Sequence, residues 1–155
     1  MLSECLTFSK MITAGIENTL AMGISPGLNI IYGNINEPLQ AINDAVEFLL
    51  KYDDHSQLRT LRPVTPYPGS ELFDIAVSKG LLRDTEDFYE NKHLNSDLLA
   101  VNFTQHGDED IYQALYLANM KLIEAYIENI KVKIQKICED LYFKKDKQFR
   151  GFRHT

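Results

Sequence analysis

Two short segments place polar or flexible residues directly after apolar runs. Gly33 and Glu37 follow the apolar residues 28–32, and Arg62 and Thr65 end a second extended run. In α/β proteins, ligands bind at the loops that leave the carboxyl ends of the strands. Glu37 would bring a carboxylate to such a loop. Arg62 would bring a guanidinium, which could bind an anionic substrate. The two segments are therefore the candidate ligand-binding site.

Each of these residues also has a structural interpretation. Gly33 ends a strand, and Glu37 favours a helix N-terminus through the helix dipole. Thr65 belongs to a turn, and Arg62 forms a surface ion pair. Both interpretations stay open at this point.

The elements that would position these residues follow from periodicity. Apolar residues recur every fourth position over 8–20 after Thr7, a candidate N-cap, and Gly23 ends this first helix. The run 28–32, which is apolar except for Asn29, predicts a strand covered on both faces. Helical spacing over 38–50 predicts a second helix, with Pro38 in its first turn.

A second strand is predicted over 58–64, where a proline-rich segment stops it. Two strands joined by a helix imply a right-handed parallel crossover. Ser70 is the predicted N-cap of a third helix that ends at Gly80. An acidic helical turn over 84–90 and a short strand over 98–103 complete this part of the chain.

One long amphipathic helix dominates the C-terminal third. Its apolar stripe steps by three or four residues and must pack on something. The helix either lies across the α/β layer or projects to meet a partner. The stripe consists of Ile111, Leu115, Ala118, Leu122, Tyr126, Ile130, Ile134, Ile137 and Leu141.

Composition excludes several classes of protein. A chain of 155 residues that is 45% hydrophobic and 25% charged is typical of one globular domain. Its net charge of -6 argues against nucleic-acid binding through a basic surface. Two cysteines outside any CxxC pattern, and histidines without ligand spacing, predict neither a disulfide framework nor a metal site. No apolar run reaches the length of a membrane span, and the chain starts without the pattern of a signal peptide. We expect a cytoplasmic protein.

Two spaced blocks resemble the C-terminal half of a radical S-adenosylmethionine (radical SAM) enzyme. One is Gly33-Asn34-Ile35-Asn36-Glu37, and the other is Arg62-Pro63-Val64-Thr65-Pro66-Tyr67-Pro68-Gly69-Ser70-Glu71-Leu72. Lys79-Gly80-Leu81-Leu82 and Asp87-Phe88-Tyr89 match as well. The likeness is to the branch that contains cobalamin-associated members and the anaerobic magnesium-protoporphyrin IX monomethyl ester cyclases.

The resemblance implies late strands and helices of a partial (β/α) barrel. It places Ile31, Gly33, Ile35 and Glu37 on the side of the cofactor, S-adenosylmethionine, with Arg62 and Thr65 at the next strand. The chain departs from the family at Ile35 and Asn36, where the family prefers proline and glycine. Asn tolerates left-handed geometry better than most residues, so the turn is expected to survive.

The CxxxCxxC loop, which holds the family's [4Fe-4S] cluster, does not occur in this chain. Without cluster ligands the chain is not expected to initiate a radical alone. We therefore expect the C-terminal portion of a larger Fe-S oxidoreductase or methyltransferase, with the cluster-bearing barrel half and a cobalamin domain as candidate partners.

The expected organisation is an α/β partial barrel fragment over 1–104, with at least two parallel strands. A long closing helix over 105–145 and a basic tail over 146–155 follow. The alternative is a free-standing, non-catalytic α/β interaction module. It would associate, for example as a homodimer, through its long helix or an open sheet edge.

Overall fold

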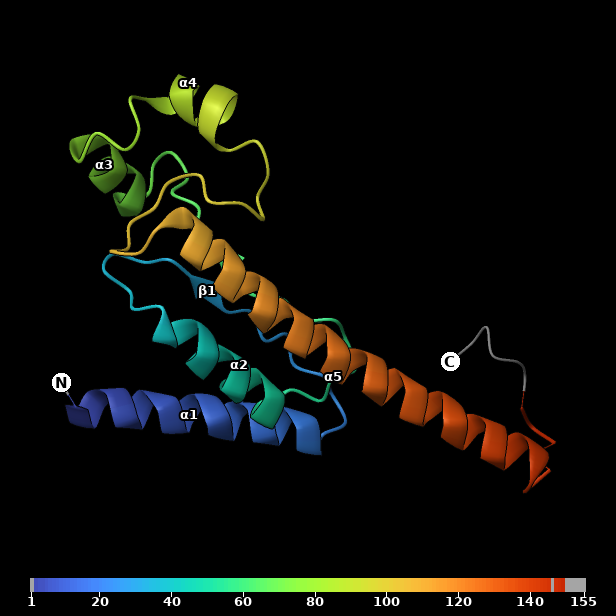
Figure 1. Ribbon diagram of the computed structural model, residues 1–155. Coiled ribbons are helices and arrows are strands. Elements are labelled where there is room, and N and C mark those ends of the chain that lie inside the picture. Colours follow the sequence, from blue (N-terminus) through green and yellow to red (C-terminus); the bar gives the residue numbers. More distant parts are fainter. Residues whose placement is uncertain (1, 146, 150–155) are drawn as a thin grey trace.

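The computed structural model describes residues 2–145 and 147–149, and the side chains of 10–145 and 147–149. Most of the predicted basic tail therefore lies outside the described residues. The elements are helices and two short strands, in the order α1 (Leu2–Ala21), β1 (Ile31–Tyr32), α2 (Gln40–Tyr52), β2 (Arg62–Pro63), α3 (Glu71–Ser78), α4 (Thr85–Asp87), the π-helical turn η1 (Phe88–Lys92) and α5 (Asp108–Tyr142). The chain is an α/β protein in which helix predominates (Figure 1).

The two strands form a parallel pair, as predicted. Ile31 lies opposite Arg62, and Tyr32 lies opposite Pro63. The N–H of Val64 donates to the Tyr32 carbonyl at 2.7 Å and extends the ladder by one bond. Both strands are much shorter than the predicted runs 28–32 and 58–64, because little of either run is hydrogen-bonded to a neighbouring strand.

One face of this pair packs into the larger of two hydrophobic cores. Tyr32 and Leu61 lie on that face, each 2% exposed, among apolar residues of α2 and α5. The opposite face carries Ile31, which is 60% exposed. The prediction of a strand covered on both faces is therefore wrong, because no described element packs over the Ile31 side.

A second, smaller core lies beyond the carboxyl ends of the strands. Phe88, fully buried, is its centre, and Phe73 of α3 meets the Phe88 ring edge to face. Ser70 caps α3, since its side chain accepts from the N–H of Phe73. Ile35 and Val64 also pack on this core, so it anchors both strand ends.

Two predicted elements differ from those in the structure, and a third, the acidic turn, forms as predicted. The first helix begins at Leu2 and Thr7 lies inside it, because no glycine or proline interrupts residues 2–6. The predicted strand over 98–103 does not form; Ala100, Val101 and Phe103 are buried as irregular backbone in the second core. The acidic turn over 84–90 is formed by α4 and η1, and Asp84 caps α4 by accepting from the N–H of Asp87.

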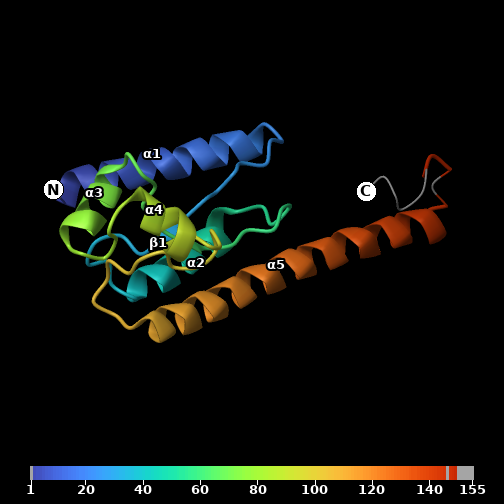
Figure 2. The ribbon, with the colours of Figure 1, turned by 90° about the horizontal axis from the view of Figure 1, so that it is seen from above.

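The long helix α5 extends well beyond the rest of the fold. Its first half packs against α2, while its second half continues past the layer of α1 and α2 (Figures 1 and 2). The buried side chains of α5 all belong to the first half: Ile111, Leu115, Ala118 and Leu122. In the described part of the chain, no helix is long and apolar enough to cross a membrane.

Candidate functional site

The loop after β1 closes on its own side chain. The carboxylate of Glu37 accepts from the N–H groups of both Gly33 and Asn34, at 2.9 Å each. Gly33 adopts a φ of 106°, in the region that favours glycine. Asn36 has a φ of 55°, so this position is left-handed, as expected for a residue that tolerates the geometry.

All five backbone N–H groups of residues 33–37 have partners within the chain. Besides the two bonds to Glu37, Ile35 donates to the Asn34 side chain at 2.9 Å. Asn36 donates to the Phe103 carbonyl, and Glu37 donates to the Asn34 carbonyl, both at 3.1 Å. The loop therefore has no free amide with which to bind an anion.

The second segment places its two candidate residues apart. Thr65 is half-buried in the turn after β2, where its carbonyl accepts from the N–H of Tyr67 at 3.0 Å. Arg62 points from the uncovered sheet face, and its Nε lies 2.9 Å from Asp97 Oδ1. Both side chains of this ion pair are 59% exposed, so it contributes little to stability.

Two hollows lie side by side on the uncovered face. The first, of about 410 Å³, is lined by residues of both strand segments, including Ile31, Leu58 and Arg62. The second, of about 540 Å³, lies between β2 and α5; it shares Leu58 and Arg62 and adds Tyr116 of α5. The uncovered face thus joins apolar surface to the exposed guanidinium of Arg62, and Arg59 also lines the first hollow.

The outer edge of β2 is closed by α5. The Asn119 side chain accepts from the N–H of Leu61 at 2.7 Å and donates to the Leu61 carbonyl at 3.1 Å. Pro63 has no N–H to offer a further strand. At this point the side-chain amide takes the place of a neighbouring strand.

The amino ends of the strands hold a separate polar cluster. Asp53, 8% exposed, pairs with Arg59 Nε at 3.2 Å, and Arg59 also donates to the Pro26 carbonyl. Burial disfavours the charged form of Asp54, but hydrogen bonds from Ser56 and Ser25 outweigh it and lower the Asp54 pKa. These groups are satisfied among themselves, so the cluster stabilises the loop.

The six sequence-predicted residues therefore divide into two groups. Ile31 and Arg62 come together on the uncovered face, as register partners. Gly33, Ile35, Glu37 and Thr65 form the turns and the second core. Sequence reasoning missed Asp97 and Asn119: Asp97 lies where the hydrophobic pattern is broken, and Asn119 is a polar residue beside the stripe of α5.

The described residues do not fit an iron–sulfur cluster. Among the described residues, no three His, Cys, Asp or Glu side chains lie close enough to hold a metal ion. The loop 33–37 does not fit an anionic group either, since its amides are all used. Of the six predicted site residues, Ile31 and Arg62 are the exposed ones.

Comparison with protein families, with curated proteins and with solved structures gave no match to this chain.

Proposed function

We propose that this chain is the C-terminal part of a radical SAM Fe-S oxidoreductase or methyltransferase that resembles the anaerobic magnesium-protoporphyrin IX monomethyl ester cyclases. The uncovered face of the β1–β2 pair is the observation that carries the proposal. In a complete barrel, the side chains on the inner face of the strands fill the interior. A half-barrel leaves that inner face exposed. Ile31, at 60% exposure in β1, is the side chain that such a face would bury.

The covered face supports the same proposal. In a (β/α) barrel, helices pack on the outside and the strands are parallel. Here α2 connects two parallel strands and packs on the face opposite Ile31. The cluster, S-adenosylmethionine and any cobalamin would then be held mainly by the other half of the enzyme, and this chain would contribute Ile31 and Arg62 to one wall.

Two experiments test the proposal. The adjacent upstream DNA should encode a CxxxCxxC motif, and an upstream reading frame without it would remove the idea. In calorimetry, S-adenosylmethionine should give no heat with this chain alone, because half a site binds poorly. Heat of S-adenosylmethionine binding should appear only when the protein encoded by the upstream reading frame (the upstream product) is added.

A variant tests which face is used. Ile31→Asp should abolish association with the upstream product while leaving the chain folded, because Ile31 is exposed in this structure. Ile12→Asp is the matched control: Ile12 is an apolar residue of α1 at 43% exposure, away from the sheet. Equal effects of the two variants would contradict the proposed face.

The uncovered second half of α5 favours a second candidate function. Ile127 and Val132 are each more than half exposed on a helix that leaves the fold. A free-standing, non-catalytic interaction module would use such a surface to associate. A clean oligomer with no heat from S-adenosylmethionine, with or without the upstream product, would support this candidate over the first.

A further inference from the structure

The second half of α5 carries an apolar stripe distinct from the one that faces the core. The distance in sequence between successive apolar residues of this stripe alternates strictly between three and four over three heptads. Apolar residues at a and d sustained over three or more heptads are typical of a coiled coil. The a and d positions are Met120, Ile123, Ile127, Ile130, Ile134, Ile137 and Leu141.

From Ile127 onward this stripe is offset from the face of α5 that packs on the body of the protein, whereas Ile123 lines the hollow between β2 and α5. At 3.6 residues per turn, its centre lies about 120° around the helix from the buried residues Ile111 to Leu122. Asn129, on the body side, donates to the His55 carbonyl at 2.6 Å. Ile127 and Ile134, on the stripe, are 56% and 44% exposed.

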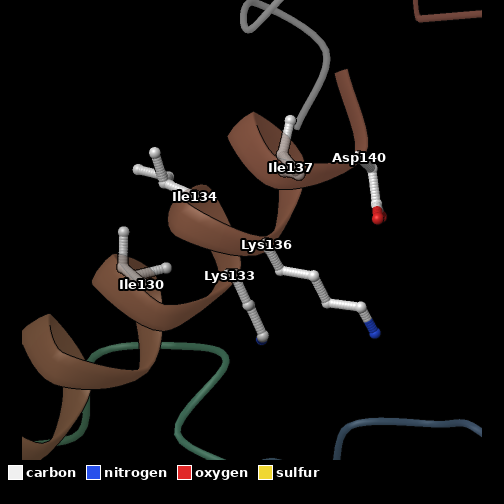
Figure 3. Close-up of a pocket in the computed structure, with 6 residues that line it drawn as sticks. All are labelled: Ile130, Lys133, Ile134, Lys136, Ile137 and Asp140. Carbon is white, nitrogen blue, oxygen red and sulfur yellow. The ribbon is translucent and has the colours of Figure 1, made fainter. Parts of the chain in front are cut away.

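The stripe forms an open groove near the end of the helix. A hollow of about 480 Å³ is lined by apolar and charged residues of α5 alone. Figure 3 shows Ile130, Ile134 and Ile137 projecting from one side of the helix, with Lys133 and Lys136 on the other. No described residue outside α5 lines this groove.

We propose that a second copy of this chain covers the stripe, with the two α5 helices antiparallel. The register pairs Ile127 with Ile130 of the partner subunit at the centre. This inference goes beyond the radical SAM proposal and does not depend on it. For the non-catalytic interaction module, the second candidate function, the second copy would be the binding partner.

Charge complementarity selects this orientation. In the proposed register the e positions bring Glu124 opposite Lys131 of the partner subunit, twice by symmetry, and Lys133 faces the partner's Tyr126. No like charges meet at the e and g positions. Shifting the antiparallel register by one heptad would bring the two Lys131 residues together and the two Lys133 residues together, which like-charge repulsion disfavours. Lys131 is held only by an exposed pair with Glu128, so it is free to exchange partners.

A parallel dimer fits the sequence less well. The parallel pairing of g with e positions would place Lys131 opposite Tyr126 and Glu124 opposite Asn119, with no opposite charges. Isoleucine at both a and d also shifts parallel coiled coils from dimers to trimers or tetramers. The two observations favour the antiparallel pair.

Analytical ultracentrifugation of the full chain tests the surface. The wild type should show a concentration-dependent dimer, and Ile134→Asp should remove it. Val132→Asp is the matched control, because Val132 is 53% exposed but lies at the outermost f position. A wild-type monomer at the highest soluble concentration, or a dimer that survives Ile134→Asp, would overturn the proposal.

Charge reversal tests the orientation. Glu124→Lys and Lys131→Glu should each weaken the homodimer roughly tenfold, because each turns two attractive pairs into repulsive ones. An equimolar mixture of the two variants should dimerise as tightly as the wild type, since every pair is again attractive. Glu139→Lys, at an f position, should have no effect. A trimer or tetramer, or failure of the mixture to recover, would contradict the antiparallel register.

The outcomes separate this proposal from the radical SAM proposal. If the chain is a monomer, the results of the upstream-DNA and calorimetry tests are not affected. If the upstream reading frame lacks the cluster motif, the dimer proposal is not affected. Co-sedimentation of a monomer with anionic phospholipid vesicles would mean that the stripe contacts lipid instead, and would overturn the second copy as its occupant. Acidic residues interspersed with the lysines, such as Glu124 and Asp140, argue against that outcome.

Discussion

The two halves of α5 both carry apolar residues at helical spacing but differ in their surroundings. In the first half, Ile111 and Leu115 are almost fully buried against α2 and the strands. In the second half, Ile127 and Ile134 are about half exposed. The apolar residues themselves are the same in kind, so the difference comes from what lies beside them.

The comparison shows how one helix can present two apolar surfaces, one to the core and one to solvent. The stripe that faces the core ends near Leu122, and the second stripe has already begun at Met120 on another side of the helix. The sheet shows the same division, since Tyr32 is buried and its neighbour Ile31 is exposed. In both places, apolar surface is left over after the core has been filled.

The largest expected difference between the halves lies in the core. Ile111→Ala should lower the free energy of unfolding by about 2–5 kcal/mol, because it leaves a cavity at a site with no exposure. Val132→Ala, in the second half, should change it by less than about 0.5 kcal/mol. Urea denaturation followed by circular dichroism measures both. Similar losses for the two variants would break the comparison.

An intermediate effect is expected where α5 meets β2. Asn119→Ala should cost about 1–3 kcal/mol, because the N–H and carbonyl of the buried Leu61 lose their partner. Asn129→Ala, further along the helix, removes a bond to a more exposed loop and should cost less. Urea denaturation of both variants orders them, and the reverse order would show that the loop, not the strand edge, anchors the helix.

Smaller effects are expected in the pH dependence of stability, and the first of them is at Asp54. Its pKa in the folded chain lies below the ordinary value of 3.8, so the unfolded chain binds more protons as the pH falls. The stability that Asp54 contributes is therefore present above about pH 4 and is lost as the pH falls through the folded pKa. Asp54→Asn should be less stable than wild type near neutral pH, and the gap should narrow in acid.

Asp140 provides the matched case in the second half of α5. An ion pair and hydrogen bond with Lys144, one turn away, lower its pKa too. Because the Lys144 side chain is largely exposed, water screens the pair, and Asp140→Asn should change the pH profile less than Asp54→Asn. Urea denaturation at a series of pH values compares them. A larger change at Asp140 would mean that the end of the helix is held more firmly than its exposure indicates.

Local signals predicted much of the secondary structure. Ser70 and Gly80 bracket α3, and Ser70 caps it as expected. The parallel pairing of the two strands and the extent of α5 were also predicted. These features depend on capping, turns and periodicity, which act within a few residues of the chain.

Two predictions failed because they depended on distant contacts. Ala100, Val101 and Phe103 of the predicted strand 98–103 are buried, but in irregular backbone, since no described strand lies beside them to complete a ladder. The apolar run 28–32 was expected to be covered twice, yet only one face is packed. An apolar residue in the sequence indicates a preference for burial. It does not indicate whether another element lies close enough to cover it.

The structure brings together only part of the candidate site. The sequence identified Ile31 and Arg62, and the structure places them together on the uncovered face. Glu37 was expected on the cofactor side, but its carboxylate holds the loop amides of Gly33 and Asn34. The ion pair of Arg62 with Asp97 joins residues far apart in the chain, so no local pattern could reveal it.

The amino-acid sequence by itself determined where the helices lie, where the turns fall and that α5 carries apolar surface along its length. Those properties follow from backbone preferences and from the 3.6-residue period, which need no partner. Only the tertiary structure decided which apolar surface is covered. Burial requires a second surface in contact, and in the described chain Ile31 of the sheet and Ile127 and Ile134 of α5 remain exposed.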